Sequence, residues 1–264
     1  MKVLIKIGGT LLDSTETQAH LVGEIAQAVR EGLQAVVVHG GGKQMTRYLA
    51  DRGIETRFVN GLRVTTPQVL DAVLKVFAGS VNKELVAALI ASGARAVGLS
   101  GMDALLTEAC RMSDELGFVG KPTRSNPELL DLLMYNSYLP VIACVAGDRE
   151  GRFYNVNADQ MAVSLACAIR AEKLLFLTDV EGVRGQDNVI YSTLGLETCR
   201  QLIDAEIATG GMRAKLEAAA EAVRTGLAEA VIAPGASPGV IGKLLAGQGI
   251  GTRLVAGIGT PTNG

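Results

Sequence analysis

The sequence predicts an α/β fold built on one central, mainly parallel sheet with helices on its faces. Short apolar runs of strand length alternate along the chain with segments of helical periodicity. Glycine clusters follow the first two apolar runs directly, where a strand turns towards the next helix. The chain has 264 residues, of which 48% are hydrophobic, so a large core can form. The sequence has no recognisable linker or repeat, and we expect one domain over residues 1–264.

The apolar runs supply the expected strands in chain order: Val3–Ile5, Ala35–Val38, Ala94–Leu99, Pro140–Val145, Lys173–Thr178 and Ala230–Ala233. Helical periodicity predicts helices around Leu21–Val29, ended by Gly32, and over 66–78, 80–92, 157–169, 195–206, 211–226 and 238–246. A further helix is expected to begin at Asn126-Pro127-Glu128, with Asn126 as its cap and Pro127 in first position. Leu105–Cys110 and Leu116–Lys121 have short alternating patterns and predict a hairpin. The Gly/Thr/Pro-rich end, residues 256–264, is expected to be frayed.

Composition and charge limit the kinds of molecule that the protein is expected to bind. The net charge is −2, and the sequence lacks tryptophan and any basic stripe with interleaved aromatics, so no nucleic-acid partner is expected. No apolar run reaches the roughly 18 residues that a membrane span needs, so no membrane partner is expected. The four cysteines form no C-x-x-C pair, so the sequence lacks the spacing of a zinc site. Their positions favour free thiols in a reducing compartment. We expect a cytoplasmic protein.

Two glycine clusters give the strongest local signal for a ligand site. Gly8-Gly9 follow the first expected strand and Gly40–Gly42 follow the second. The carboxyl ends of parallel strands form the ligand-binding edge of such sheets, and glycines let backbone N–H groups converge on an anion. Lys6 lies in the first apolar run directly before its glycines, where burial without an anion is costly. The alternatives are glycines that only form turns and a lysine that reaches the surface.

The spacing of these glycines argues against two common nucleotide-binding folds. Gly40-Gly41-Gly42-Lys43 lacks the earlier glycine and the following Ser or Thr of a P-loop. No G-x-G-x-x-G run opens a helix with an acidic residue about twenty positions later. A P-loop NTPase and a dinucleotide-dependent oxidoreductase are therefore disfavoured.

Three other segments place polar groups next to expected turns. In the run Asn155–Asp159, Asn157 can cap a helix and Asp159 suits its positive end, but capping does not explain Asn155. Arg63 follows the turn Asn60-Gly61 and is suited to bidentate recognition of a carboxylate, or is a plain surface charge. Lys215 lies about one turn into a helix that Gly210-Gly211 open, and the alternative is a solvated lysine.

A series of segments, in their order and spacing, resembles the amino acid kinase family over roughly residues 2–255. They are Lys6–Gly9, Val38–Gly42, Asn60–Thr65, Asn82-Lys83, Gly98–Gly101, Tyr138–Val141, Asn155–Asp159, Thr178–Gly182, Gly211–Lys215 and Gly249–Thr252. The resemblance implies the amino acid kinase fold, a three-layer sandwich around a central mainly parallel sheet. It also implies an N-terminal acceptor-binding lobe (about 1–170) and a C-terminal nucleotide-binding lobe (about 171–256).

The resemblance also implies roles, position by position. Lys6 and Lys215 would stabilise the transferred phosphoryl group, and Asp159 would hold both lysines, so these are the implied catalytic residues. The implied acceptor-binding residues are Gly41, Gly42, Arg63 and Asn155, with Arg63 on the α-carboxylate. The implied nucleotide-binding residues are Gly8, Gly9, Thr178, Asp179, Gly182, Thr209, Gly210 and Met212.

The implied reaction is ATP-dependent phosphorylation of the γ-carboxylate of N-acetyl-L-glutamate to an acyl phosphate, in arginine biosynthesis. Mg²⁺ is expected on the nucleotide phosphates, with no protein metal site. Because Met1 directly precedes the first strand, we expect a homodimer without an additional N-terminal helix. Two alternatives remain: a kinase of a carrier-protein-linked aminoadipate or glutamate in lysine biosynthesis, and a non-catalytic relative that senses nucleotide or amino acid.

Overall fold

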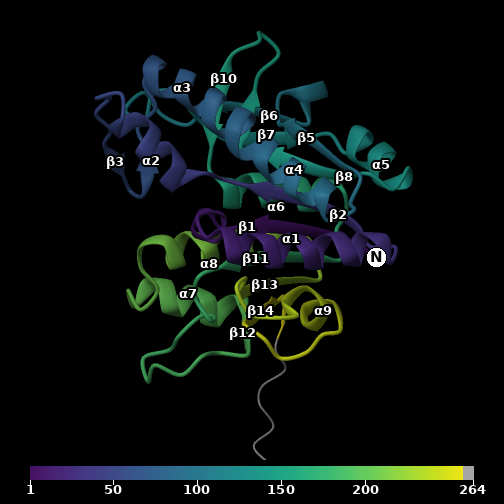
Figure 1. Ribbon diagram of the computed structural model, residues 1–264. Coiled ribbons are helices and arrows are strands. Elements are labelled where there is room, and N and C mark those ends of the chain that lie inside the picture. The colour runs from purple at the N-terminus through teal and green to yellow at the C-terminus, as the bar shows by residue number, and fades with distance from the viewer. Residues whose placement is uncertain (258–264) are drawn as a thin grey trace, which may run out of the picture.

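A computed structural model of the protein describes residues 1–257 and has an eight-stranded sheet at its centre (Figure 1). The strand order is β12-β14-β13-β11-β1-β2-β8-β5. The β13–β14 pair is antiparallel, and the other neighbouring pairs of this sheet are parallel. The strands are β1 Lys2–Ile7, β2 Gln34–His39, β5 Ala96–Ser100, β8 Leu139–Ala143, β11 Lys173–Thr178, β12 Thr193–Gly195, β13 Glu229–Pro234 and β14 Thr252–Val255. This confirms the predicted α/β class with a mainly parallel sheet.

Helices cover both faces of the sheet. On one face α1 lies beside both α4 and α9, and on the other α6 packs against α8. The helices are α1 Thr15–Arg30, α2 Gly42–Ala50, α3 Pro67–Val73, α4 Asn82–Ala91, α5 Glu128–Tyr135, α6 Ala158–Ala168, α7 Leu196–Asp204, α8 Gly210–Arg224 and α9 Val240–Leu245. A π-helix, Leu74–Val81, joins α3 to α4, and short 3₁₀ turns lie at Gly9–Leu12 and Asp103–Leu105. Across residues 1–257, none of the helices combines the length and apolar character that crossing a membrane requires.

A small barrel of four strands stands beside the main sheet. Its strands are β6 Thr107–Arg111, β7 Val119–Ser125, β9 Val145–Gly147 and β10 Phe153–Val156, in the order β10-β7-β6-β9. The antiparallel pair β6–β7 confirms the predicted hairpin. A separate two-stranded ribbon, β3 Phe58–Val59 and β4 Leu62–Arg63, turns at Asn60-Gly61.

Several element boundaries differ from the sequence prediction. The expected strand Pro140–Val145 is wrong at its end, because the chain leaves the main sheet after Ala143 and enters the barrel as β9. The helix expected at Asn126 begins at Glu128, although the Asn126 side chain still accepts from the Glu128 N–H at 3.1 Å. The two helices expected over 66–92 form one run through the π-helix. The predicted frayed end lies mostly outside the described residues.

Strand alternation decides which helix each side chain on the central strands meets. Lys6 and His39 occupy neighbouring strands, but His39 is in register with Ile7 and not with Lys6. Their side chains therefore leave the sheet on opposite faces. Lys6 reaches Asp159 on α6, whereas His39 reaches Asn82 on α4. Each face of the sheet therefore has one polar contact close to the glycine turns: Lys6 with Asp159 on one face and His39 with Asn82 on the other.

A carboxylate from the first helix holds the last helix in place. Glu24 on α1 accepts from the backbone N–H of Gly239 at 2.6 Å and of Ile241 at 2.9 Å, at the start of α9. The two oxygens of one carboxylate thus cover two N–H groups that the helix start leaves open.

We expect Glu24→Gln to lower the free energy of unfolding by about 1–2 kcal/mol, because the amide has only one acceptor oxygen and no charge. Chemical denaturation of the two proteins measures the difference. Glu31→Gln, which changes an exposed carboxylate just past the end of the same helix, serves as the control and should stay within about 0.5 kcal/mol. A Glu24→Gln protein as stable as the parent would contradict this role.

Candidate active site

The two glycine clusters meet at the carboxyl ends of β1 and β2. A Cβ atom added to Gly9 would lie 3.5 Å from the backbone nitrogen of Gly42 and 4.0 Å from that of Gly41. The Gly8 N–H donates to the Leu177 carbonyl at 2.8 Å, which ties this turn to the end of β11. Three neighbouring strands of the parallel sheet therefore end around one small volume, close to the start of α2.

A buried three-charge cluster lies next to these turns. The Lys6 ammonium is 2.6 Å from Asp159 Oδ1, and the Lys215 ammonium is 3.8 Å from Asp159 Oδ2. The side chains of Lys6 and Asp159 are each 8% exposed and that of Lys215 is 18% exposed. The cluster joins β1, the first turn of α6 and the second turn of α8, which are distant in the chain. The structure therefore brings together the three predicted catalytic residues.

The electrostatics of this cluster follow from burial and from its own charges. Burial alone would raise the pKa of Asp159, but Lys6 and Lys215 outweigh it and hold that pKa below its usual value. Burial lowers the pKa of Lys215, an effect that Asp159 partly offsets. Asp159 is therefore ionised at neutral pH and can only accept hydrogen bonds. It is suited to orient two ammonium groups and cannot act as a proton donor.

Local sequence explains how Asp159 reaches this position. The Asn157 side chain accepts from the N–H groups of Asp159 and Gln160, at 2.9 and 3.2 Å, and so caps α6. The capping prediction is confirmed. The cap fixes the first turn of the helix, where a negative charge is favourable.

A buried guanidinium contacts the second glycine turn. Arg63 is only 9% exposed, and its side chain donates to Thr56 Oγ1 at 3.0 Å and Thr46 Oγ1 at 2.7 Å. It also donates to the Gly42 carbonyl at 3.3 Å and stacks over the Phe58 ring. Among residues 1–257, Arg63 forms no ion pair with a carboxylate. Burial lowers the pKa of its guanidinium. Such a guanidinium is suited to a carboxylate ligand.

Asn155 is tied to the same region through Thr65. The Asn155 amide donates to Thr65 Oγ1 at 3.0 Å, and the Thr65 hydroxyl donates to the Arg63 carbonyl at 3.0 Å. Thr65 is fully buried. The predicted acceptor-binding residues Gly41, Gly42, Arg63 and Asn155 therefore belong to one connected region, and Thr65 is a linking residue that sequence reasoning missed. Its hydroxyl alone gave no pattern that could have revealed it.

The predicted nucleotide-binding residues divide between two segments. At the end of β11 the buried Thr178 hydroxyl donates to Asp179 at 3.1 Å, and Gly182 follows closely against Thr252. Burial would raise the pKa of Asp179, but backbone and hydroxyl donors and the charge of Lys215 hold it lower. Thr209 precedes α8, which begins at Gly210. The N–H groups of Met212 and Arg213 donate to the Thr209 carbonyl at 3.1 and 3.2 Å, which leaves those of Gly210 and Gly211 available to an anion. The Met212 side chain packs partly against the core.

A cavity of about 810 Å³ adjoins the charge cluster. It is lined by the β3–β4 turn on one side and by the starts of α6 and α8 on the other: Asn60, Gly61, Leu62, Asn157, Asp159, Gly210, Gly211, Arg213, Ala214, Lys215 and Glu217. Its walls thus contain Asp159, Lys215 and the helix start that the sequence had singled out. Its size suits a small polar molecule with part of a nucleotide.

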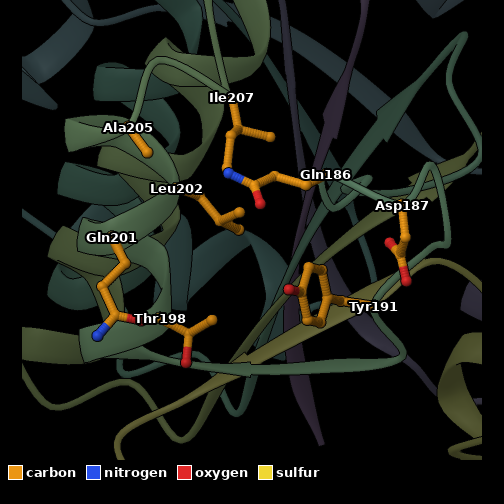
Figure 2. A pocket seen from close by; sticks show the side chains of 8 residues that line it. All are labelled: Gln186, Asp187, Tyr191, Thr198, Gln201, Leu202, Ala205 and Ile207. Atoms are coloured by element: carbon orange, nitrogen blue, oxygen red, sulfur yellow. The ribbon is translucent and has the colours of Figure 1, made fainter.

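A second cavity, of about 470 Å³, lies beside α7 (Figure 2). Thr198, Gln201 and Leu202 face it from α7, and Gln186, Asp187 and Tyr191 face it from the preceding loop. Ala205 and Ile207 complete it from the turn that leads to Thr209. Within the described part of the chain its lining contains no lysine or arginine, so its chemistry differs from that of the charge cluster. Sequence reasoning missed these residues because they form no compact motif.

His39 is buried and is uncharged at neutral pH. Burial lowers its pKa to about 4, although a bond to the Gly40 carbonyl works in the other direction. The ring is fully enclosed and contacts Gly40 and Asn82. It is therefore a neutral imidazole directly before the second glycine cluster.

The chain belongs to the amino acid kinase family, whose sequence profile matches residues 1–234. A relative named acetylglutamate kinase, from Solibacter usitatus (strain Ellin6076), is 60% identical over 255 residues, covering 97% of this chain and 99% of that protein. Another protein of that name, from Acidobacterium capsulatum, is 41% identical over 259 residues and is covered completely, against 97% of this chain.

Solved structures agree on the fold. N-acetylglutamate synthase from Neisseria gonorrhoeae, complexed with coenzyme A and N-acetyl-glutamate, matches with a TM-score of 0.86 at 26% identity. The match covers 98% of this chain and 60% of that one. Carbamate kinase from Giardia lamblia bound to AMP-PNP matches with a TM-score of 0.71 at 17% identity, over 97% of this chain and 98% of that one. The three-layer amino acid kinase fold is thereby confirmed.

We expect Asp159→Asn to lower the free energy of unfolding by about 3 kcal/mol at pH 7, because two buried ammonium groups lose their counter-charge. Calorimetry measures the loss. Because the pKa of Asp159 is lowered in the folded protein, its contribution is present above its unfolded pKa and disappears on acidification through the folded one.

The matched control is Glu217→Gln, which removes an exposed carboxylate paired with Arg213 on α8. That change should cost less than about 1 kcal/mol. If both variants lost the same free energy of unfolding, the buried charge of Asp159 would contribute no more to stability than an exposed carboxylate does.

Proposed function

We propose that the protein is an ATP-dependent kinase of the γ-carboxylate of N-acetyl-L-glutamate, acting in arginine biosynthesis. The observation that carries the proposal is the buried Lys6–Asp159–Lys215 cluster beside two converging glycine turns. The cluster and the turns offer two cations and backbone donors to one small volume. The names of the relatives at 60% and 41% identity support N-acetylglutamate as the acceptor.

The reaction needs positioning and charge stabilisation more than acid–base help. A γ-carboxylate oxygen attacks the γ-phosphorus of ATP, a new O–P bond forms, and the bond to the bridging oxygen of ADP breaks. ADP leaves with that electron pair, and no proton has to move, because a carboxyl group of pKa about 4.3 is already ionised. A reaction without proton transfer is consistent with a neutral His39 and with an Asp159 carboxylate that is paired with Lys6 and Lys215.

Lys6 and Lys215 would contact the transferred phosphoryl group from β1 and α8. Their charges offset the repulsion between an anionic acceptor and an anionic donor, and this repulsion is greatest when the two are closest. Asp159 would keep both ammonium groups in place. The buried setting strengthens these interactions, because little water remains to screen them.

Arg63 would bind the α-carboxylate of the acceptor, with Asn155 as a second polar contact. The two hydroxyls that hold the guanidinium, Thr46 and Thr56, are neutral, so its charge remains available to a ligand. Gly41 and Gly42 would direct N–H groups towards the acceptor and the phosphoryl group. This assigns acceptor binding to residues of the N-terminal lobe, about 1–170.

ATP would lie across the C-terminal lobe, about 171–256, with its phosphates at Gly8, Gly9 and the start of α8. The remaining contacts would come from Thr178, Asp179, Gly182, Thr209, Gly210 and Met212. The cavity beside α7 has no cationic side chain in its described lining, and Ile207 in that lining is two residues before Thr209 in the chain. Both observations support it as the binding place of the adenine ring of ATP. Mg²⁺ would be bound to the phosphates, where it would supply charge neutralisation.

We also propose a cytoplasmic homodimer. Ile90 on α4 and Leu132 and Tyr135 on α5 are exposed apolar side chains, and a second copy of the chain would cover such a surface. Sedimentation analysis of the purified protein tests this assembly, and a monomer at micromolar concentration would exclude it.

The substrate assignment is tested by incubating the protein with Mg-ATP and a panel of acids, and trapping the acyl phosphate with hydroxylamine. N-acetyl-L-glutamate should give ADP and hydroxamate in equal amounts. Turnover only with a carrier-linked aminoadipate or glutamate would move the assignment to lysine biosynthesis. Binding of nucleotide without any turnover would indicate a sensor.

We expect Lys6→Ala and Lys215→Ala each to lower kcat by on the order of 10²-fold or more, as for the loss of a transition-state donor. Steady-state kinetics with saturating substrates measures the change. Lys43→Ala, which removes an exposed lysine at the start of α2, is the control and should keep kcat within about two-fold. A normal kcat in either cluster variant would remove that lysine from the mechanism.

For Arg63→Ala we expect mainly a raised KM for the acceptor, by roughly 10-fold or more, with a smaller change in kcat. Initial rates at varied acceptor and fixed ATP give both constants. Arg57→Ala, which removes an exposed arginine from the segment before β3, should leave the acceptor KM unchanged. The binding role would be excluded by an Arg63→Ala protein with the parent's acceptor KM.

A further inference from the structure

A chain of hydrogen bonds leads from the exposed Lys83 on α4, through two buried side chains, to the second glycine cluster. Lys83 Nζ approaches Asn82 Oδ1 at 3.3 Å, and Asn82 Nδ2 is 3.0 Å from His39 Nε2. His39 Nδ1 is 2.8 Å from the Gly40 carbonyl. Asn82 is 1% exposed and His39 is fully enclosed. None of these residues belongs to the proposed catalytic or binding set.

The donors and acceptors in this chain can be assigned from its carbonyl ends. Asn82 Nδ2 is also 2.9 Å from the Val141 carbonyl, which can only accept, so this atom must be the NH₂ group. The same group then donates to His39 Nε2, which must be the unprotonated nitrogen. The Gly40 carbonyl likewise can only accept, so His39 Nδ1 carries the proton. The network therefore specifies one neutral tautomer of the imidazole.

Gly98 explains why the amide can occupy this place. A Cβ atom at Gly98 would lie 2.1 Å from Asn82 Oδ1 and 2.8 Å from Lys83 Nζ, so any side chain there would displace both. The segments Asn82-Lys83 and Gly98–Gly101, which carry part of the family resemblance, thus form one structural unit. The proposed function assigns no role to either segment.

The π-helix that precedes Asn82 contacts the same turn from a second direction. A Cβ atom at Gly41 would lie 2.9 Å from Phe77 Cδ1 and 3.4 Å from Val81 Cγ2. The turn is therefore enclosed by the π-helix at Gly41 and oriented by the imidazole at Gly40. π-helical turns of this kind often accompany functional sites.

We propose that Asn82 and His39 are positioning residues: Asn82 selects the Nδ1–H tautomer of His39, and that proton fixes the Gly40 carbonyl so that Gly41 and Gly42 direct their N–H groups into the site. The inference rests on the proposed phosphoryl transfer. A peptide unit has its C=O and the next N–H on opposite sides, so holding the Gly40 carbonyl also sets the direction of the Gly41 N–H. Small errors in such donors have large effects on rate.

Two substitutions of His39 separate its two contacts. In His39→Asn the amide nitrogen can take the place of Nδ1 and donate to Gly40, whereas in His39→Gln the longer side chain places a group near Nε2, facing Asn82. We expect kcat with N-acetylglutamate to fall about 10-fold or more in His39→Gln, and to stay roughly five-fold or more higher in His39→Asn than in His39→Gln. Equal kcat values in the two variants would overturn the proposal.

Asn82→Asp tests the choice of tautomer. A carboxylate can only accept, so it draws the imidazole proton to Nε2 and leaves Nδ1 without one, or it gives an imidazolium. Long-range ¹H–¹⁵N spectra are recorded in the His20→Gln background, which leaves His39 as the single histidine. At pH 7 we expect the neutral Nδ1–H form in the protein that retains Asn82, and we expect Asn82→Asp to abolish that form. An Nε2–H form in the protein that retains Asn82 would overturn the proposal.

The matched control is Leu89→Ala, a buried change about two turns further along α4. It should lower the melting temperature and leave kcat within about two-fold. A fall in kcat equal to that of His39→Gln, measured well below both melting temperatures, would show that general loosening of the helix explains the effect. The spectra need no turnover, so an inactive parent would refute the proposed function without deciding the tautomer.

Discussion

The fold is organised around the need to bury two lysines next to one aspartate. Lys6, Asp159 and Lys215 come from β1, α6 and α8, and their ammonium–carboxylate distances are 2.6 and 3.8 Å. Isolated charges at this depth would be strongly unfavourable, so each element has to be placed accurately against the others. The central position of β1 between β2 and β11 meets that requirement, because both glycine turns and the end of β11 then surround the cluster.

This arrangement leaves an excess of positive charge in a region with little water. Two lysines face one aspartate. Arg63, which we propose binds the acceptor, has two neutral hydroxyls as its described side-chain hydrogen-bond partners. An anionic donor and an anionic acceptor would restore electrical balance there. The proposed chemistry and the stability of the site thus depend on the same charges.

Much of the fold could be predicted from the sequence, because buried parallel strands are continuous apolar runs and their helices are periodic. The glycine clusters and Lys6 indicated the site for a similar reason, since they interrupt an apolar pattern. Short strands such as β10, β12 and β14 could not be predicted, because three or four residues carry too little periodicity. The transfer of the chain from β8 to the barrel at Cys144 depends on tertiary contacts. So do Thr65, the contacts of Asn82, and the cavity beside α7, whose residues share no spacing.

The continuous sheet also limits how the molecule can deform. β1 pairs in parallel with β11 over five residue positions, from Val3–Lys173 to Ile7–Leu177. Figure 1 shows the sheet continuing from β8 and β2 in one half, through β1 and β11, to β13 and β14 in the other half. The two halves are thus joined by a backbone ladder that a hinge would have to break. Any opening between the β3–β4 turn and α8 has to come from elastic twisting of strands or from local movement of the turn. Opening between the β3–β4 turn and α8 should therefore be elastic, with a restoring force that increases with the width of the opening.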